Sequence, residues 1–335
     1  MANPVRRQRQ PEEEPRPEAK VRGREADSPS QIPSPGWRDV ALRVWENLSR
    51  KNIPIIAAGV AYYGLFSIFP ALAALISVYG LVVDPATVEQ QVSSLTAVIP
   101  AEAQGILADQ MKAVSSSSGT GLGLGLVVSV LVALWTATQG TKASMTALNV
   151  VYEEPEQRGF LRFTATALAL TAGGILFVIV ALALVAVLPA VLKFIGLGGV
   201  TEILLQLGRW PVLGAMVMLA LAVVYRYAPS RDMPRWRWVS WGAAVATVLW
   251  LAGSGLFSYY VSHFGSYNKT YGSVGAVVVL LLWMYLSAFV VLLGGMLNAE
   301  LEHQTARDST VGQPKPMGQR NARMADTLGK GGKRR

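Results

Sequence analysis

The sequence predicts an all-α, polytopic membrane protein with six transmembrane helices and additional amphipathic helices on the membrane surfaces. Of its 335 residues, 52% are hydrophobic and only 15% are charged, whereas a soluble domain carries about 25% charged residues. The mean hydropathy is +0.36. These values, together with long apolar segments, indicate a chain that is built for a lipid bilayer.

Six apolar segments have about the 20 residues that a helix needs to cross the hydrocarbon core of a membrane. The last segment follows the polar stretch YNKTYGS and continues without a charge for 24 residues, about 36 Å of helix. A β-strand does not need such a length. The six predicted spans are 53–81, 122–139, 165–192, 211–228, 239–262 and 274–297.

The distribution of basic residues tests this count independently. The segments up to Lys51, 142–162, 226–237 and from residue 298 onwards contain 26 of the 30 Lys and Arg residues. Six spans place these four segments on one side of the membrane, and the positive-inside rule makes that side cytoplasmic. We therefore expect both termini in the cytoplasm. Topology explains the net charge of +9 better than nucleic-acid binding does.

The sequence outside the spans divides into two tails and a membrane domain. Residues 1–36 contain seven prolines and thirteen charges, which predicts a disordered tail. Residues 37–304 form the membrane domain, and residues 305–335 are predicted to be a disordered basic tail that is drawn to anionic lipid.

Amphipathic helices are predicted on both membrane surfaces. In residues 37–52, apolar side chains from Trp37 to Leu48 recur at helical spacing, which is typical of a helix on a membrane surface or of one packed on a protein core. In the 84–120 loop, 88–99 and 103–114 each have an apolar helical face.

The residue inventory argues against several enzyme classes. The chain has no cysteine and only two histidines, so thiol chemistry and cysteine-ligated metals are excluded. His263 and His303 are predicted on opposite sides of the membrane, where they cannot cooperate in acid–base cleavage of RNA. We predict no catalytic residue, cofactor or metal site.

Polar residues inside the spans are the candidate functional groups, because lipid makes unpaired polar groups costly. They either line a shared cavity for a polar or amphipathic solute or form hydrogen bonds between helices. No Asp or Glu lies near the middle of a span, which disfavours proton-coupled transport. The candidate cavity-lining residues are Tyr62, Tyr63, Ser67, Trp135, Thr138, Gln139, Ser258, Tyr259 and Tyr260.

Three stretches resemble the YihY/BrkB family of bacterial inner-membrane proteins: AAGVAYYGLFSIFPALAAL at 57–75, VYRYAPSRD at 224–232, and YNKTYGSVGAVVVLLLWMYLS with GGMLNAELE at 267–302. The resemblance implies about six spans, and members have carried the labels ribonuclease BN and virulence factor BrkB. The candidate motif residues are Tyr267, Asn268, Tyr271, Gly272, Gly275, Trp283, Asn298 and Glu300.

One position departs from the pattern that the resemblance implies. The family sequence at the end of the last span reads Gly-Ala-Glu-Leu-Asn-Ala, whereas this chain has Met296 where the glutamate is expected. A role of that carboxylate in moving protons or binding a cation is then lost or passes to Glu300.

Three functions from different classes remain. The polar residues in three spans and the surface helices favour a transporter or a protein that handles a lipid or envelope precursor. A structural or assembly protein without flux is the alternative, and helix faces rich in glycine are compatible with an oligomer. Ribonuclease activity is the least favoured, with Glu153, Glu154 and Glu156 as the nearest cluster of carboxylates.

Overall fold

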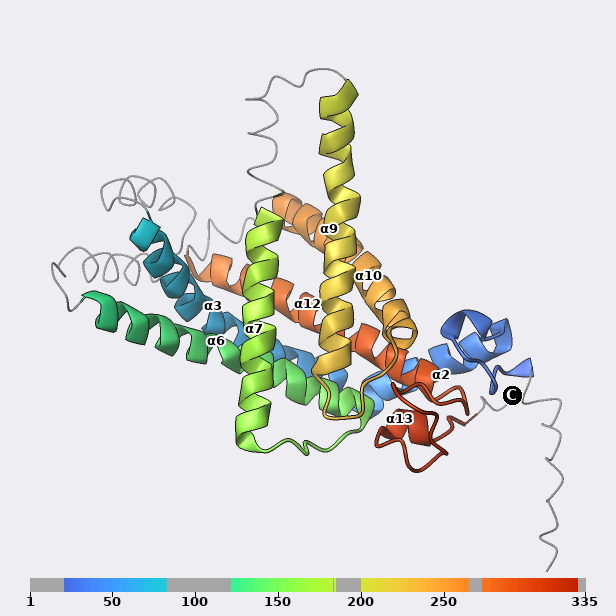
Figure 1. Ribbon diagram of the computed structural model, residues 1–335. Helices are drawn as coiled ribbons and strands as arrows, with labels where there is room; N and C mark the ends of the chain where they lie inside the picture. Colours follow the sequence, from blue (N-terminus) through green and yellow to red (C-terminus); the bar gives the residue numbers. More distant parts are fainter. Residues whose placement is uncertain (1–20, 83–121, 183, 185–199, 265–272, 331–335) are drawn as a thin grey trace, which may run out of the picture.

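The computed structural model describes residues 21–82, 122–182, 184, 200–264 and 273–330, and in this part of the chain the fold is helical (Figure 1). The described residues contain no β-strand, only an isolated bridge between Pro234 and Thr310. The long helices are α2 (Ser34–Arg50), α3 (Ile53–Val82), α6 (Leu122–Tyr152), α7 (Phe160–Leu182), α9 (Val200–Tyr227), α10 (Trp236–Phe264) and α12 (Ser273–Glu302). Two short elements, η1 (Pro29–Gln31) and α13 (Arg323–Asp326), flank this set.

Each of the six predicted spans corresponds to one long helix, from α3 to α12. Helix α6 continues to Tyr152, well past the predicted end of its apolar segment, because Met145, Leu148 and Tyr152 form a buried stripe beyond the purely apolar part. An apolar run in the sequence marks the part of a helix that faces lipid. The helix itself can extend beyond the end of that run.

Within the described residues, four helical segments are long and apolar enough to cross a membrane: Phe160–Ala181, Trp210–Tyr227, Trp236–His263 and Val277–Glu302. A shorter apolar helix, Ile53–Ser67, lies in α3. These segments bear out a helical membrane protein, and the number of six spans stays a prediction.

The helices form two groups that meet at one end. Helices α3, α6 and α12 pack side by side, and α10 packs along α12. Helices α7 and α9 contact each other and stand at a steep angle to that group (Figure 1). Helix α7 is joined to the larger group mainly through α6, and α9 mainly through α10.

The four basic segments meet at this shared end of the helices, which we call the basic end (residues 21–52, 149–163, 225–238 and 297–330). Lys51 donates a hydrogen bond to the Val151 carbonyl at 2.8 Å, and the Ser230 N–H donates one to Asn149 Oδ1 at 2.8 Å. Because these contacts join different segments, the four segments lie on one side of the bundle, as the charge distribution requires. The direction in which that side faces stays a prediction.

The described parts of both tails are ordered and packed against each other, unlike the disorder that the sequence predicts for them. Ala26 and Ile32 are buried beside Leu301. The Ala306 N–H donates to the Arg24 carbonyl at 2.7 Å, and the Thr305 hydroxyl donates to the Ala26 carbonyl at 2.7 Å. Contacts of this kind, made across the whole length of the chain, are not visible in local composition. Residues 1–20 and 331–335 lie outside the described part.

Helix α2 combines both predicted environments. Its residues Val40 and Asn47 are buried against the bundle, and Trp37 packs on Trp241 with ring centroids 5.3 Å apart. Trp45, on another face, is 77% exposed. One face therefore packs on protein, and the other is free to meet a membrane surface. The two helices predicted at 88–99 and 103–114 lie outside the described residues.

Candidate functional site

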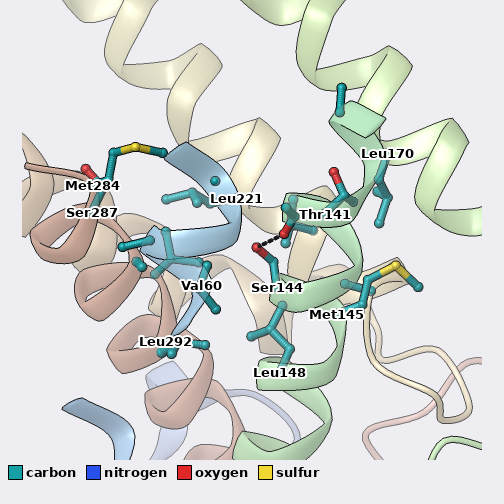
Figure 2. A pocket seen from close by; sticks show the side chains of 18 of the residues that line it. Val60, Thr141, Ser144, Met145, Leu148, Leu170, Leu221, Met284, Ser287 and Leu292 are labelled. Carbon is teal, nitrogen blue, oxygen red and sulfur yellow. Dashed lines mark hydrogen bonds between the residues drawn. The ribbon is translucent and has the colours of Figure 1, made fainter. Parts of the chain in front are cut away.

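A cavity of about 440 Å³ lies inside the helix bundle where the two groups of helices converge. Figure 2 shows side chains from α3, α6, α7, α9 and α12 around it. The wall is mainly aliphatic, with Val60, Leu170, Leu221 and Leu292 among its residues, and none of its described residues is charged. Cavities of this size and composition hold the apolar part of a small molecule.

The few polar groups in the wall are bonded to the protein itself. Ser144 donates to the Gly140 carbonyl at 3.0 Å, and Thr141 shares a hydrogen bond with Thr171 at 2.7 Å. Ser287 accepts a hydrogen bond from the Trp250 indole at 3.0 Å. Because these hydroxyls already have partners, the cavity favours an apolar occupant over a hydrated ion.

Small residues allow the helices of the wall to approach each other. The Gly140 N–H in α6 donates to Ser67 Oγ in α3 at 3.1 Å, and a side chain at Gly140 would also press on the Gly64 backbone. Small residues at such crossings are a common packing device in membranes. At this crossing, Gly64 and Gly140 both line the cavity.

The nine polar residues predicted to line a cavity lie on neighbouring faces of the same helices and are not among the described residues of this wall. Tyr62, Tyr63, Trp135, Ser258, Tyr259 and Tyr260 are exposed on the surface of the described residues, and Tyr62 packs on Phe66. Ser67 holds the α3–α6 crossing, whereas Thr138 and Gln139 hydrogen bond to the Trp135 carbonyl in their own helix. The residues that do line the cavity, such as Ala61, Thr141 and Ser144, lie only one to a few positions along the chain from the predicted residues.

The motif at the end of the chain contributes to both the cavity and the basic end. Trp283 lines the cavity and donates a hydrogen bond to Ser254 Oγ at 3.3 Å. Asn298 joins α12 to α10, since its Oδ1 accepts from the Gly242 N–H at 2.7 Å and its Nδ2 donates to the Val239 carbonyl at 3.1 Å. Gly275 is buried. Tyr267, Asn268, Tyr271 and Gly272 lie outside the described residues.

Glu300 fixes α2 to the end of α12. Its carboxylate lies 2.6 Å from Arg43 Nε and accepts a hydrogen bond from Asn47 Nδ2, also at 2.6 Å. His303 Nδ1 is 3.5 Å away on the next turn. A carboxylate held by several partners at the edge of the bundle is suited to anchoring helices.

A second buried ion pair also lies at the basic end. Arg231 Nη2 and Glu302 Oε2 are 2.6 Å apart, and both side chains are completely buried. Burial alone would lower the pKa of Arg231, but the neighbouring Glu302 raises that pKa above its ordinary value, so the guanidinium stays charged. Ser309 donates a further hydrogen bond to Glu302.

Met296 is fully buried in the apolar core of the bundle. A glutamate at this position would need a partner inside an apolar cluster. The methionine of this chain instead makes the region continuous with the hydrophobic core.

Each of the three acidic residues in the loop after α6 makes a separate structural contact. Glu153 pairs with Lys51 at 2.9 Å, Glu154 accepts the Arg323 N–H at 2.7 Å, and Glu156 pairs with Arg158 at 2.7 Å. Within the described ranges, no three His, Asp or Glu side chains gather as a metal-ligand set. His263 lies about 40 Å of helix away from the start of α10 at the basic end. His303 lies at the basic end itself.

Comparison with known proteins identifies the family of the chain. A sequence profile described as virulence factor BrkB matches residues 44–318. The chain belongs to the BrkB family. A protein of Bacillus subtilis (strain 168), YfkH, which carries a ribonuclease-like name, is 31% identical over 253 residues, which are 73% of this chain and 88% of YfkH.

Shorter matches connect this BrkB-family chain to proteins named UPF0761 membrane proteins. IL2447 of Idiomarina loihiensis is 31% identical over 106 residues, 32% of this chain and 34% of the relative. A protein of Tolumonas auensis is 35% identical over 104 residues, 31% of this chain and 32% of the relative. No solved structure matches the chain.

The sequence does not predict two groups of residues that line cavities in the structure. Thr141 and Ser144 of the cavity wall lie beyond the predicted end of the second span, on either side of the charged Lys142. The arginines of a second, basic cavity come from separate loops and helix ends. The apolar stripe continues through Met145 and Leu148, and this pattern is the sequence signal that could have extended the second predicted helix.

Proposed function

We propose that this BrkB-family protein binds the apolar part of a lipid or envelope precursor between its helices and moves that molecule within the membrane. The observation that carries the proposal is the cavity of about 440 Å³, which five helices surround. Its aliphatic wall matches an acyl or prenyl chain better than a hydrophilic solute.

The charges around the cavity support an uncoupled binding role over ion-driven flux. Among the described residues, the wall has no carboxylate or amine. Glu300 and Glu302, two buried acids of α12, are both paired with arginines at the basic end. A proton-coupled transporter usually has an ionisable group on its pathway.

The surroundings of the cavity are compatible with entry from the lipid phase. Helix α7 contributes Leu170 to the wall, and the same helix has apolar side chains on its outer surface, including Leu176 and Val178, that are more than half exposed. A helix with few protein contacts can shift at a lower energetic cost than one held on all faces.

The proposed orientation places the basic end in the cytoplasm of a bacterial inner membrane, because the positive-inside rule applies to the 26 basic residues of the four basic segments. The exposed basic residues of the C-terminal segment, such as Arg307 and Lys330, would then face anionic lipid of the inner leaflet. A fluorescent reporter that matures only in the cytoplasm, fused after Arg335, should therefore fluoresce in cells. A full-length fusion that stays dark would contradict this orientation.

A cavity-filling pair of variants tests the proposed function. Ala61 lines the cavity and is buried, whereas Ala58, less than one turn earlier on α3, faces outwards. We expect Ala61→Phe to abolish enrichment of a specific lipid in the gently purified protein and to slow its movement in reconstituted vesicles. Ala58→Phe should behave like the unchanged chain. Ser144→Met is a second filling variant if Ala61→Phe does not fold.

The measurements are mass spectrometry of the co-purified lipids and a flux assay in vesicles of envelope lipids. Enrichment of one lipid or precursor, lost only in the filling variants, supports the proposal. Bulk lipids in bulk proportions and no protein-dependent movement would contradict it and favour the structural or assembly role.

A further inference from the structure

A second cavity, of about 330 Å³, lies at the basic end where α7 begins and α9 ends. Four arginines line it together with two aliphatic hydroxyl residues: Arg158, Arg162, Arg226, Arg231, Thr166 and Ser230. These side chains come from α7, α9 and the two loops beside them, so the fold gathers positive charge that is dispersed in the sequence.

Two of the arginines are neutralised by carboxylates. Arg158 binds Glu156 through two of its nitrogens, each at 2.7 Å, and Arg231 is paired with Glu302. Among the described residues of this wall, Asp232 is the one acid, and Lys315 holds it at 2.7 Å.

Arg162 and Arg226 have no carboxylate partner among the described residues. The Arg226 guanidinium lies over the Trp236 ring, 4.5 Å from its centroid, and donates from Nη1 to the Pro234 carbonyl at 2.6 Å. Its Nε is buried without a hydrogen-bond partner in the described part of the chain, and so is Nη1 of Arg231. A buried donor without a partner is costly, and an anion in the cavity would supply an acceptor.

The cavity lies at the boundary between apolar helix and polar loop. Arg162 is in the first turn of α7, next to Phe160 and Leu161, which are 69% and 82% exposed. Exposed apolar side chains beside arginines are typical of the depth at which lipid headgroups lie.

We propose that this basic cavity binds a phosphate group, and that a membrane lipid carries it. Arginine forks match the geometry of phosphate oxygens and can hold them in pairs. Arg162 and Arg226 together offer two uncompensated charges, which equal the charge of a phosphate monoester dianion. The lipid as the source of the phosphate rests on the function proposed above, whereas phosphate binding itself does not.

The two cavities share helix α7 in a way that suits one amphipathic ligand. Arg162 and Thr166 line the basic cavity, and Leu170 lines the apolar one. Thr166 and Leu170 are separated by about 6 Å along the helix axis. A phosphate at Arg162 would therefore leave its apolar chain close to the level of the apolar cavity.

Titration of the purified full chain with dioctanoyl phosphatidic acid tests the proposal, with inorganic phosphate as the second probe. We expect Arg162→Gln, at an exposed position where folding should be unaffected, to weaken binding of the lipid about tenfold or more, the factor that loss of one charge-assisted hydrogen bond produces. Arg226→Gln should have a similar effect. The matched control is Arg237→Gln, because Arg237 is an exposed arginine of the same end outside the cavity.

The outcomes separate the two sources of phosphate. Arginine-dependent binding of phosphatidic acid that millimolar phosphate does not displace supports a lipid source. Equal, arginine-dependent binding of inorganic phosphate alone supports the phosphate site and overturns the lipid source. Equal binding of the lipid by the unchanged chain and Arg162→Gln overturns the proposal.

The same variants distinguish failure of this inference from failure of the proposed function. Lipid movement that Ala61→Phe stops, together with lipid binding that Arg162→Gln leaves unchanged, contradicts the phosphate site and retains the function. Arginine-dependent phosphate binding in a chain that moves no lipid retains the site and contradicts the function.

Discussion

The two halves of helix α12 meet different surroundings although they belong to one continuous helix. From Leu292 to Glu302 most side chains are buried, and Asn298, Glu300 and Glu302 are held by partners from α10, α2 and the loop before α10. Towards the other end, Val278 and Leu282 are about half exposed. The comparison indicates that the basic end fixes the helices, whereas the other half of α12 has fewer protein contacts.

The difference follows from how polar groups behave in each environment. At the basic end, loops and tails bring water-soluble chain over the helix ends, so arginines and carboxylates can pair with several partners each. In the membrane half, apolar side chains gain little from packing on each other, because lipid is an equally apolar neighbour. Packing between the helices can therefore be looser there than at the basic end.

The largest effect should come from breaking the completely buried ion pair. Glu302→Gln leaves Arg231 charged without its partner, and we expect a loss of about 3–5 kcal/mol in unfolding free energy. The control is Asp232→Asn, which removes the exposed pair with Lys315 and should cost less than about 1 kcal/mol. Thermal unfolding in detergent, followed by tryptophan fluorescence, measures both.

The double variant Arg231→Met/Glu302→Leu sharpens this result. If the pair acts as a fixed buried unit, removal of both charges should recover most of the stability lost in Glu302→Gln. Equal losses for the Glu302 and Asp232 variants would contradict the view that the basic end is the rigid part.

Truncation of leucines along α12 compares the two halves directly. Leu301 is fully buried in a cluster with Val40 and Trp238, so Leu301→Ala should cost about 2–5 kcal/mol. Leu282 is 48% exposed on the same helix, and Leu282→Ala should cost less than about 0.5 kcal/mol. Unfolding of both variants in detergent gives the two values. Similar losses at the two positions would show that the exposed half is buried against a partner.

A glycine pair tests the close approach of α10 and α12. A side chain at Gly242 would collide with the Gly294 carbonyl and with Asn298, both of which are fixed, so Gly242→Ala should cost about 1–3 kcal/mol or more. Gly255 lies on the same helix with open space around it, and Gly255→Ala should be neutral or slightly stabilising. Chemical unfolding of both variants in mixed micelles gives the comparison, and a tolerated Gly242→Ala would contradict the tight crossing.

The sequence is a good guide to features that depend on local composition. The six apolar segments predict six helices, because the length of an apolar run can be counted directly from consecutive residues. The count of Lys and Arg in the loops predicts that the four basic segments lie together, and contacts such as Lys51 with Val151 confirm it. Of the motif residues, Trp283 lines the apolar cavity, and Asn298 and Glu300 join helices at the basic end.

Features that depend on helix orientation could not be predicted in the same way. A helix that is apolar on all sides gives no sign of which face meets a cavity, so polarity favours Tyr62 although its neighbour Ala61 lines the wall. The partners of Glu300 lie on α2, more than 250 positions away in the chain. The order of the tails has the same cause, because it depends on contacts between the two ends of the chain.

The smallest predicted effect concerns pH at the edge of the basic cavity. Partial burial alone would raise the pKa of Glu156, but hydrogen bonds from Arg158 and Asn149 lower it from 4.5 to about 2. A carboxylate with a lowered pKa stabilises the folded state above its unfolded pKa, and this contribution is lost as the pH falls through the folded value. The difference in melting temperature between the unchanged chain and Glu156→Gln should therefore be constant above about pH 5 and shrink towards pH 2. A difference that does not change over this range would mean that Glu156 and Arg158 are not paired, and that Arg158 adds its charge to the basic cavity.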